Sequence, residues 1–552
     1  MHISWPWRLA VLGALVTVPC GADDVKNIAI IGAGAAGSSA AFHLWRYALE
    51  EDIAVNITIF EKTGRIGGRS LTVNAYNDPT EPIELGASIF VGANAILVNA
   101  SERFQLPMSE PQRLEKDDIT AIWDGYEFVF QTTEGSWGGW DLAKMFWRYG
   151  LSPLRTKRMV SAMVDEFLKL YEPPYFPFKS LSQRSKQLGF IKMTGITGEQ
   201  LFKDTNIDSR FAREILQVAT RVNYASNLAY IHGLETMVSL ATDGARSIET
   251  GNWQIFEKMV LESRATVYRN TTVASIETAQ KKAQSSSPKY IVCISDANSG
   301  GDSPEQHSVE FDNVIIANPW QFSKIKAGEG VLERAIDEIP YTKLHVTLFT
   351  SPLELSPEFF GLKPGSKAPA TVYTTLDKNE EPKQGADGVG RTGFYSVSTL
   401  KYIINPKTGQ KERAYKIFSP KPVTAEFLTR LLGTEIPESV ISSKGEDTSF
   451  KPITWYYPHA FYSYPIELPR VTFEDPVIGQ GVYYTSGIES FVSCMETSAL
   501  MGKNVARLIA DDFSGISRPD IVLDRFDEEM NEQVAVEEEV KEGIHVQAGG
   551  EL

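Results

Sequence analysis

The sequence is poor in cysteine, short of basic residues and without a long apolar run. Its 552 residues include three cysteines, too few for a fold that depends on disulfides. No stretch reaches the roughly 18 apolar residues that a membrane-spanning helix needs, so we expect no transmembrane span. Lysine and arginine number 54 against 70 aspartates and glutamates, a net charge of −16. A surface of that sign repels phosphate backbones and argues against nucleic acid as a partner.

The first 22 residues predict a secretory signal peptide. Arg8 is followed by the apolar stretch 9–18 and by small residues around Ala22 that suit cleavage. The chain also has three N-glycosylation sequons, at Asn56, Asn99 and Asn270. Asn56 lies in a predicted strand, which argues against its glycosylation. We expect a glycoprotein of the secretory pathway, either secreted or delivered to a lysosome or vacuole.

A dinucleotide-binding unit begins directly after this segment. The β-branched, apolar run 26–31 predicts a buried parallel strand, and it leads through a G-x-G-x-x-G segment into a helical sequence. Gly32 permits the tight turn, Gly34 lets a pyrophosphate approach the backbone, and Gly37 lets the helix pack on the strand. Glu61, at the end of the next predicted strand, can accept hydrogen bonds from ribose hydroxyls.

A second G-x-G-x-x-G segment, residues 388–393, is interpreted differently. It follows a polar loop instead of a strand and precedes an alternating, strand-like sequence. A nucleotide site needs the strand, the glycines and the helix in that order. We therefore predict a turn there, and a single dinucleotide site in the chain.

The residues after Glu61 favour FAD over NAD. Arg65-Ile-Gly67-Gly68-Arg69 resembles the GRxGGR segment of the flavin amine oxidase superfamily, in which glycines lie against the cofactor and arginines offer donors to phosphate. Near the C-terminus, a strand followed by Gly487-Ile-Glu489 and an amphipathic helix also resembles that superfamily. The resemblance implies that this unit holds the ribityl chain, with Glu489 bonded to a hydroxyl. Without a separate nicotinamide site, oxygen is the simplest electron acceptor.

The expected fold is α/β, with a Rossmann-type, flavin amine oxidase-like FAD domain that is discontinuous in sequence. We assign residues 24–110, 235–325 and 475–515 to this domain. A discontinuous α+β substrate domain takes residues 111–234 and 326–474, helical in its first part and strand-rich in its second. Residues 516–552 form an acidic C-terminal tail.

Several segments of the chain resemble one family within this superfamily. Arg221-Val-Asn-Tyr224, Ile231-His232-Gly233 and Tyr464-Pro465 are similar to the signature of the prenylcysteine oxidases. The resemblance covers nearly the whole chain after the signal peptide and departs at Ala225-Ser226, which stand in place of Gly-Gln.

This resemblance implies an FAD-dependent oxidase that cleaves farnesyl- or geranylgeranyl-cysteine, derived from degraded prenylated proteins. The products are cysteine, an isoprenoid aldehyde and hydrogen peroxide. Hydride leaves the allylic carbon beside sulfur, water adds, and the hemithioacetal collapses. The partners are thus a small isoprenoid thioether and oxygen, and the thioether requires a long apolar pocket with a few polar groups. Peripheral contact with lipid and the oligomeric state stay open.

Four side chains are candidates to position water or substrate: Tyr224, His232, His459 and Tyr464. A histidine near neutral pKa can move protons, although a core histidine with its hydrogen bonds satisfied is the commoner case. Cys494 is interpreted as an inert thiol and not as a covalent link to flavin. No motif predicts a metal site.

Two other functions fit the same cofactor motifs. The first is an FAD-dependent amine oxidase, which would release an amine product and no thiol. The second is a non-enzymatic, flavin-stabilised lipid-binding protein, in which bound cofactor contributes stability alone. Analysis of the products separates all three.

Overall fold

The glycine-rich segment joins a buried strand to a helix, and a second buried strand follows that helix. The computed structural model describes residues 25–110, 115, 118–132, 139–279, 289–296, 309–443 and 452–518. Strand β1 (Lys26–Ile31) leads into helix α1 (Ala35–Glu50), and β2 (Val55–Phe60) pairs with β1 in parallel. The last four residues of both strands are buried, which explains their continuous apolar sequence. The predicted signal peptide and nearly all of the predicted tail lie outside the described residues.

These strands belong to a sheet, called here the Rossmann sheet, with the order β20-β21-β13-β1-β2-β9. Its other strands come from distant parts of the chain: β9 (Thr266–Tyr268), β13 (Asn313–Ile316), β20 (Val477–Gly479) and β21 (Val482–Tyr484). All neighbours pair in parallel except β20 and β21. The prediction of a Rossmann-type α/β fold is confirmed.

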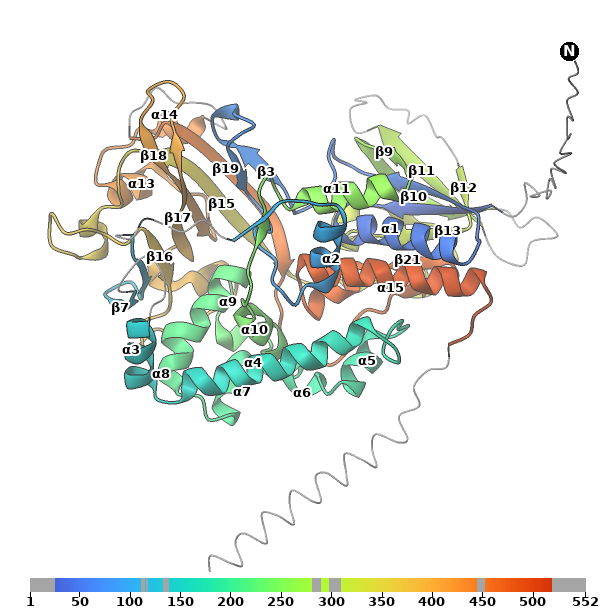
Figure 1. Ribbon diagram of the computed structural model, residues 1–552, viewed down its shortest axis with the longest axis horizontal. Coiled ribbons are helices and arrows are strands. Elements are labelled where there is room, and N and C mark those ends of the chain that lie inside the picture. Colours follow the sequence, from blue (N-terminus) through green and yellow to red (C-terminus); the bar gives the residue numbers. More distant parts are fainter. Residues whose placement is uncertain are drawn as a thin grey trace, which may run out of the picture.

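Helix α15 (Met495–Phe513) packs along α1 beside this sheet (Figure 1). At Gly502 a Cβ atom would lie 2.1 Å from the carbonyl oxygen of Ala36, so only glycine allows so close an approach of the two helices. Helix α11 (Trp253–Glu262) also contacts α1. A smaller sheet lies alongside and consists of β12 (Val309–Phe311), β11 (Tyr290–Asp296), β10 (Thr271–Thr278) and β14 (Lys326–Ala327).

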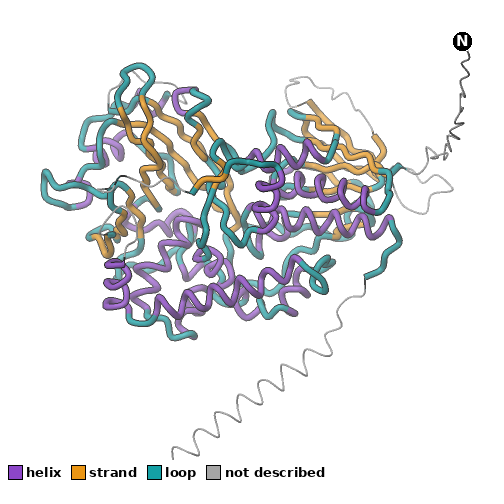
Figure 2. The backbone as a smooth tube through the Cα atoms, viewed as in Figure 1, coloured by secondary structure: helices purple, strands orange, loops and turns teal. Residues whose placement is uncertain are grey.

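A second large sheet stands on the opposite side of the molecule (Figure 2). Its order is β19 (Trp455–Pro465), β15 (Tyr341–Ser351), β18 (Lys411–Ser419), β17 (Ser396–Ile404), β16 (Thr371–Thr374), β6 (Thr120–Trp123) and β7 (Phe128–Gln131). Neighbours pair antiparallel except β16 with β6. We call it the substrate sheet.

A layer of helices lies below both large sheets in Figure 1. It contains α3 (Gly139–Tyr149), α4 (Ser152–Leu168), α5 (Leu181–Gln187), α6 (Ile191–Thr194), α7 (Gly198–Asp204), α8 (Ser209–Phe211), a π-helical turn (Ala212–Leu216), α9 (Gln217–Tyr224) and α10 (Gly233–Leu240). Helix α10 packs on α4, α6, α7 and α9. It therefore joins the helical layer, although the sequence assigned residues from 235 onward to the FAD domain.

Shorter elements complete the described fold: α2 (Ala95–Arg103), α12 (Trp320–Ser323), α13 (Ala425–Leu432), α14 (Glu438–Ser442), β3 (Thr72–Asn74), β4 (Pro82–Glu84), β5 (Met108–Ser109) and β8 (Ser247–Ile248). The second G-x-G-x-x-G segment lies in a 3-10 helix (Gly385–Thr392) after a loop, so it has no strand–glycine–helix context. No helix in the described ranges combines the length and the apolarity that crossing a membrane requires.

Candidate active site

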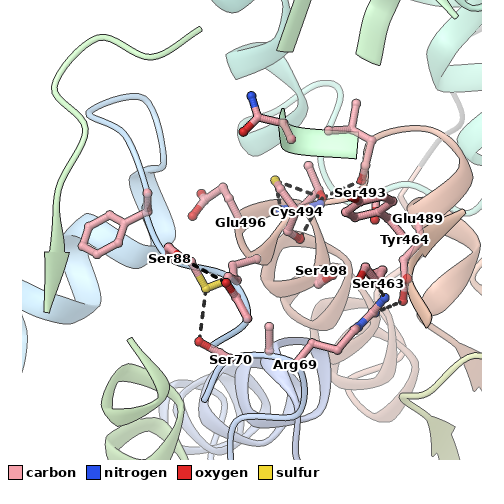
Figure 3. A pocket seen from close by; sticks show the side chains of 18 of the residues that line it. Arg69, Ser70, Ser88, Ser463, Tyr464, Glu489, Ser493, Cys494, Glu496 and Ser498 are labelled. Atoms are coloured by element: carbon pink, nitrogen blue, oxygen red, sulfur yellow. Dashed lines mark hydrogen bonds and ion pairs between the residues drawn. The ribbon is translucent and has the colours of Figure 1, made fainter. Parts of the chain in front are cut away.

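A cavity of about 770 Å³ lies where the Rossmann sheet, the helical layer and the substrate sheet meet. Gly32, Ala317 and Thr485, which follow β1, β13 and β21, line one end of it. Ligands of parallel α/β sheets bind at this carboxyl edge. Figure 3 shows side chains from segments far apart in sequence, among them Arg69, Tyr464 and Glu489, around the same space.

The glycine-rich segment shapes the floor at this end. Gly32 has a φ of +105°, which residues with a Cβ atom rarely adopt. At Gly37 a Cβ atom would lie 2.0 Å from the carbonyl oxygen of Gly32, so only glycine lets α1 start this close to the turn. Gly34 and Gly68 face each other on the cavity wall, and a Cβ atom on Gly34 would meet nothing nearer than Gly68 Cα, at 3.8 Å.

Glu61 lies at the edge of this floor, buried but lining the cavity. Its Oε2 accepts a hydrogen bond from the backbone N–H of Ala33, and its Oε1 accepts from the N–H and the hydroxyl of Thr63, all at 2.8 Å. These bonds fix the carboxylate. Since each carboxylate oxygen can accept more than one hydrogen bond, Glu61 can also receive ribose hydroxyls.

The two arginines of the GRxGGR segment have different positions. Arg65 donates to the carbonyl oxygens of Gly68, at 2.6 Å, and Ser70, at 3.5 Å, and it is not among the residues that line the cavity. It holds the turn, so the structure does not support the prediction that Arg65 reaches a phosphate. Arg69 does line the cavity.

Arg69 forms an ion pair with Glu489, with Nη2 and Oε1 2.7 Å apart, and donates to the carbonyl oxygen of Ser463 at 2.7 Å. Glu489 is buried, and its Oε2 accepts from the Tyr341 hydroxyl at 3.0 Å. Gly487 serves packing, because a Cβ atom there would lie 2.5 Å from the carbonyl oxygen of Glu474. The Arg69–Glu489 pair thus joins the floor of the cavity to the segment that begins α15.

This end of the cavity fits FAD. Gly34, Gly67 and Gly68 leave bare backbone for a pyrophosphate at the N-terminus of α1, next to a fixed carboxylate. Three buried polar atoms of cavity-lining residues have no hydrogen-bond partner in the part of the chain that the structure describes: Asn318 Oδ1, Ser463 Oγ and Tyr464 Oη. A buried polar atom without a hydrogen bond costs free energy, so polar groups of a bound cofactor or substrate would satisfy them.

The other end of the cavity is largely apolar. Helix α4 contributes only apolar side chains: Met163, Val164, Phe167 and Leu168. The substrate sheet contributes further apolar residues to the lining, Leu344, Val346, Leu400 and Phe418, and the polar residues Ser396, Ser398 and Lys416. Such a space suits a long apolar chain that ends in a polar group.

Two of the four predicted substrate-positioning residues lie at the cavity. Tyr224 and Tyr464 both line it, and their rings make an edge-to-face contact with centroids 5.4 Å apart. Burial, the main cause, raises the pKa of both hydroxyls well above the usual value, and the nearby Glu235 carboxyl raises that of Tyr224 further. Both tyrosines therefore stay neutral and can donate hydrogen bonds.

The structure brings neither predicted histidine to the cavity lining. His232 is fully buried at the N-terminus of α10, where its Nδ1 accepts from the backbone N–H of Glu235 at 3.0 Å. Burial lowers the pKa of His232 to about 3, so the ring is neutral and caps a helix. His459 lies in β19 between Tyr457 and Phe461. The prediction that these histidines move protons at the site is therefore not supported.

Sequence reasoning missed Glu496 and Lys416, which line the cavity, and it named Cys494, which lines it too. Glu496 accepts hydrogen bonds from the backbone N–H groups of Ile96 and Leu97, and burial raises its pKa to about 7. Cys494 caps α15, and burial raises the pKa of its thiol to about 11, which agrees with an inert, protonated thiol. Lys416 reaches the cavity from β18. No local motif marks Glu496 or Lys416, because their hydrogen-bond partners are distant in sequence.

Comparison with known proteins gives two family matches. Residues 132–519 match the family described as "Prenylcysteine lyase", and residues 30–99 match the "NAD(P)-binding Rossmann-like domain". Among curated proteins, farnesylcysteine lyase of Arabidopsis thaliana is 29% identical over 540 residues, covering 92% of this chain and 95% of that protein. Prenylcysteine oxidase 1 of Bos taurus is 27% identical over 501 residues, covering 89% of each.

Among solved structures, cyclohexylamine oxidase from Brevibacterium oxydans IH-35A is similar with a TM-score of 0.52 and 15% identity, covering 89% of this chain and 99% of that chain. A likeness at this identity shows a shared fold and carries no information about the substrate.

Proposed function

Because the chain belongs to the prenylcysteine lyase family, we propose that it is an FAD-dependent thioether oxidase that cleaves farnesyl- or geranylgeranyl-cysteine. The products are cysteine, an isoprenoid aldehyde and hydrogen peroxide. The observation that carries the proposal is the continuity of the cavity: one space joins the dinucleotide floor to a wall of apolar side chains. The substrate's reacting carbon must lie where these two parts meet.

When bound, FAD supplies the acceptor for the hydride that leaves the substrate. The protein's own part is to hold and enclose the thioether. The apolar residues of α4 pack against the isoprenoid chain and keep bulk water away from it. The buried, neutral hydroxyl of Tyr464 has no protein partner and can orient either the sulfur or the attacking water. Cys494 stays protonated and therefore does not compete with water as a nucleophile.

The test uses the purified holoprotein without oxygen. Farnesylcysteine should bleach the flavin absorbance, and aeration should then give hydrogen peroxide and one free thiol for each flavin reduced. A matched control is the analogue in which the allylic double bond is saturated, because it cannot stabilise the developing cation and should leave the flavin oxidised. Bleaching by an amine, with none by prenylcysteine, would refute the proposal.

We also propose that the protein contacts lipid peripherally, which would deliver an apolar substrate. The end of α3 and the start of α4 expose four large apolar side chains: Phe146, Trp147, Leu151 and Leu154. Trp147 is 93% exposed. Exposed basic residues follow, namely Arg155, Lys157 and Arg158. Apolar and basic side chains together favour anionic membrane surfaces. Trp147→Ser should weaken sedimentation with anionic vesicles, and Leu261→Ser, at an exposed leucine of α11, is the control.

We further propose that the protein enters the secretory pathway and ends in a lysosome or vacuole or outside the cell. The signal-like N-terminus and the three sequons support this. Asn56, Asn99 and Asn270 are all exposed, including Asn56, which the sequence had suggested was inaccessible. Treatment of protein from a eukaryotic host with a glycosidase should reduce its apparent mass. No change in mass would count against the proposal.

A further inference from the structure

Lys416 presents a buried cation to the cavity. Lys416 is 6% exposed and lines the cavity from the middle of β18. Its Nζ donates to the carbonyl oxygen of Glu84 and to the hydroxyl of Ser88, both at 2.9 Å. An ammonium group has three N–H donors, so these two bonds leave one donor for a ligand.

The charge of Lys416 has no ion-pair partner among the described residues within the distance of a salt bridge. The Glu84 carboxylate is close enough to favour the charged amine, but burial outweighs this and lowers the pKa of Lys416 to about 8. The other charged residues of the cavity lining are already engaged: Glu61 and Glu496 by backbone N–H groups, and Arg69 and Glu489 by each other. Lys416 is thus the lining cation left to pair with an anionic ligand.

The neighbours of Lys416 make this part of the wall polar. Ser398 of β17 lies directly opposite Lys416 in the register, and Ser396 lies opposite Phe418. Both serines line the cavity. The side chains that α4 contributes to the same cavity are all apolar. A ligand with one long apolar chain and one anionic end therefore has a defined orientation, with the anionic end on the substrate sheet.

Lys416 is also linked to the cofactor end. Ser88, which accepts a hydrogen bond from Lys416, lies two residues after Gly86. Gly86 packs closely on Arg69, because a Cβ atom on Gly86 would lie 1.8 Å from the carbonyl oxygen of Arg69. The backbone N–H of Ala87 donates to that same oxygen at 3.3 Å. In a prenylcysteine the carboxylate carbon is four bonds from the carbon that reacts. A carboxylate-binding group must therefore lie within a few bonds of the reacting carbon, and Lys416 meets this need through Ser88, whose segment packs on Arg69.

We propose that Lys416 binds the α-carboxylate of the amino-acid end of the substrate and so makes the enzyme specific for free prenylcysteine. This inference rests on the proposed function. Charge-assisted hydrogen bonds to a buried carboxylate are strong, and the ammonium gains the ion-pair partner that it lacks among the described residues. Substrates without the carboxylate leave Lys416 unpaired, and they are disfavoured for that reason.

The test uses stopped flow to measure the anaerobic reduction of the flavin in the holoprotein. The two substrates are farnesylcysteine and S-farnesylcysteamine, which lacks the carboxylate. This half-reaction separates the dissociation constant of the substrate from the rate constant of reduction. The wild type should bind farnesylcysteine about 10 to 100 times more tightly than the cysteamine. Lys416→Met should lose that difference by weakening only farnesylcysteine, and Lys416→Arg should recover part of it.

Lys401→Met is the matched control, since Lys401 lies in β17 of the same sheet, forms an ion pair with Glu81 and is not part of the cavity lining. It should leave both dissociation constants unchanged. Equal affinities of the wild type for the two compounds would overturn the inference without use of any variant. If Lys416→Met binds both compounds more weakly by the same factor, the lysine serves to anchor Ser88. If the variant has an altered flavin content or absorbance, the lysine serves the cofactor. Either result overturns the inference. If farnesylcysteine fails to reduce the wild-type flavin, the proposed function falls and the inference falls with it.

Discussion

Alanine should act differently at two glycines of the cofactor floor. At Gly37 it should mainly lower the stability of the protein, and at Gly34 it should mainly weaken FAD binding. At Gly37 an added Cβ atom would lie 2.0 Å from the carbonyl oxygen of Gly32, well inside contact distance, so α1 must shift. At Gly34 the nearest atom would be Gly68 Cα, at 3.8 Å, which is an ordinary contact. Neither residue has a positive φ, so alanine adds no backbone strain at either position. Steric contact and position in α1 separate the two sites, since Gly34 is the N-cap residue and Gly37 lies inside the helix.

We expect Gly37→Ala to destabilise the protein even without cofactor. Overpacking of this kind costs about 1–3 kcal/mol, partly offset by the gain of up to about 1 kcal/mol for alanine over glycine in a helix. Gly34→Ala should destabilise the apoprotein by less than about 1 kcal/mol, the cost of alanine in place of glycine at the N-cap of α1, because its methyl group extends into the cavity without a clash. It should weaken FAD binding at least about tenfold, or about 1.4 kcal/mol, since the methyl group takes the place of the pyrophosphate.

The assays are thermal unfolding of the apoproteins and titration with FAD followed by quenching of its fluorescence. The reasoning is refuted if Gly34→Ala destabilises the apoprotein as much as Gly37→Ala does. It is equally refuted if Gly34→Ala binds FAD with wild-type affinity, because the glycine-lined floor would then not hold the pyrophosphate.

Three further outcomes are expected. Arg69→Met leaves the buried Glu489 without its ion-pair partner and should destabilise the apoprotein by about 2–4 kcal/mol in urea unfolding. This is the usual loss for a broken buried ion pair, reduced because Arg69 is partly exposed. Glu489→Gln should destabilise the apoprotein less. Tyr464→Phe removes a hydroxyl without a protein partner, so apoprotein stability should change by less than about 0.5 kcal/mol while flavin reduction slows about tenfold. The pKa of His232 is lowered from 6.5 to about 3 in the folded protein. As the pH falls below 6.5, the unfolded protein therefore takes up a proton at His232 that the folded protein does not, and the folded protein loses stability. His232→Asn keeps a helix cap but removes this titration. Between pH 7 and pH 5 its loss of unfolding free energy should be smaller than that of the wild type by up to about 2 kcal/mol. Equal losses would show that His232 is not the titrating group.

The cofactor half of the site was predictable because it is local in sequence. Strand, glycine turn, helix and Glu61 lie within residues 26–61, and backbone sterics and the helix terminus dictate their arrangement. The same local logic rejected residues 388–393, where no strand precedes the glycines. It failed at Arg65 and Arg69, which look equivalent in the sequence; only the folded chain shows that one holds the turn and the other pairs with Glu489.

The substrate half depended on tertiary structure. The hydrogen-bond partners of Lys416, Glu84 and Ser88, are more than 300 positions away in sequence, so no spacing rule could have connected them to it. His232 looked like a proton carrier by its residue type, but complete burial and a capping hydrogen bond make it a structural residue. Sequence by itself determined where the backbone can approach a dinucleotide, because that depends on consecutive glycines. Which side chains surround the substrate was decided by the packing of separate sheets and helices, since burial and charge pairing arise only after distant segments meet.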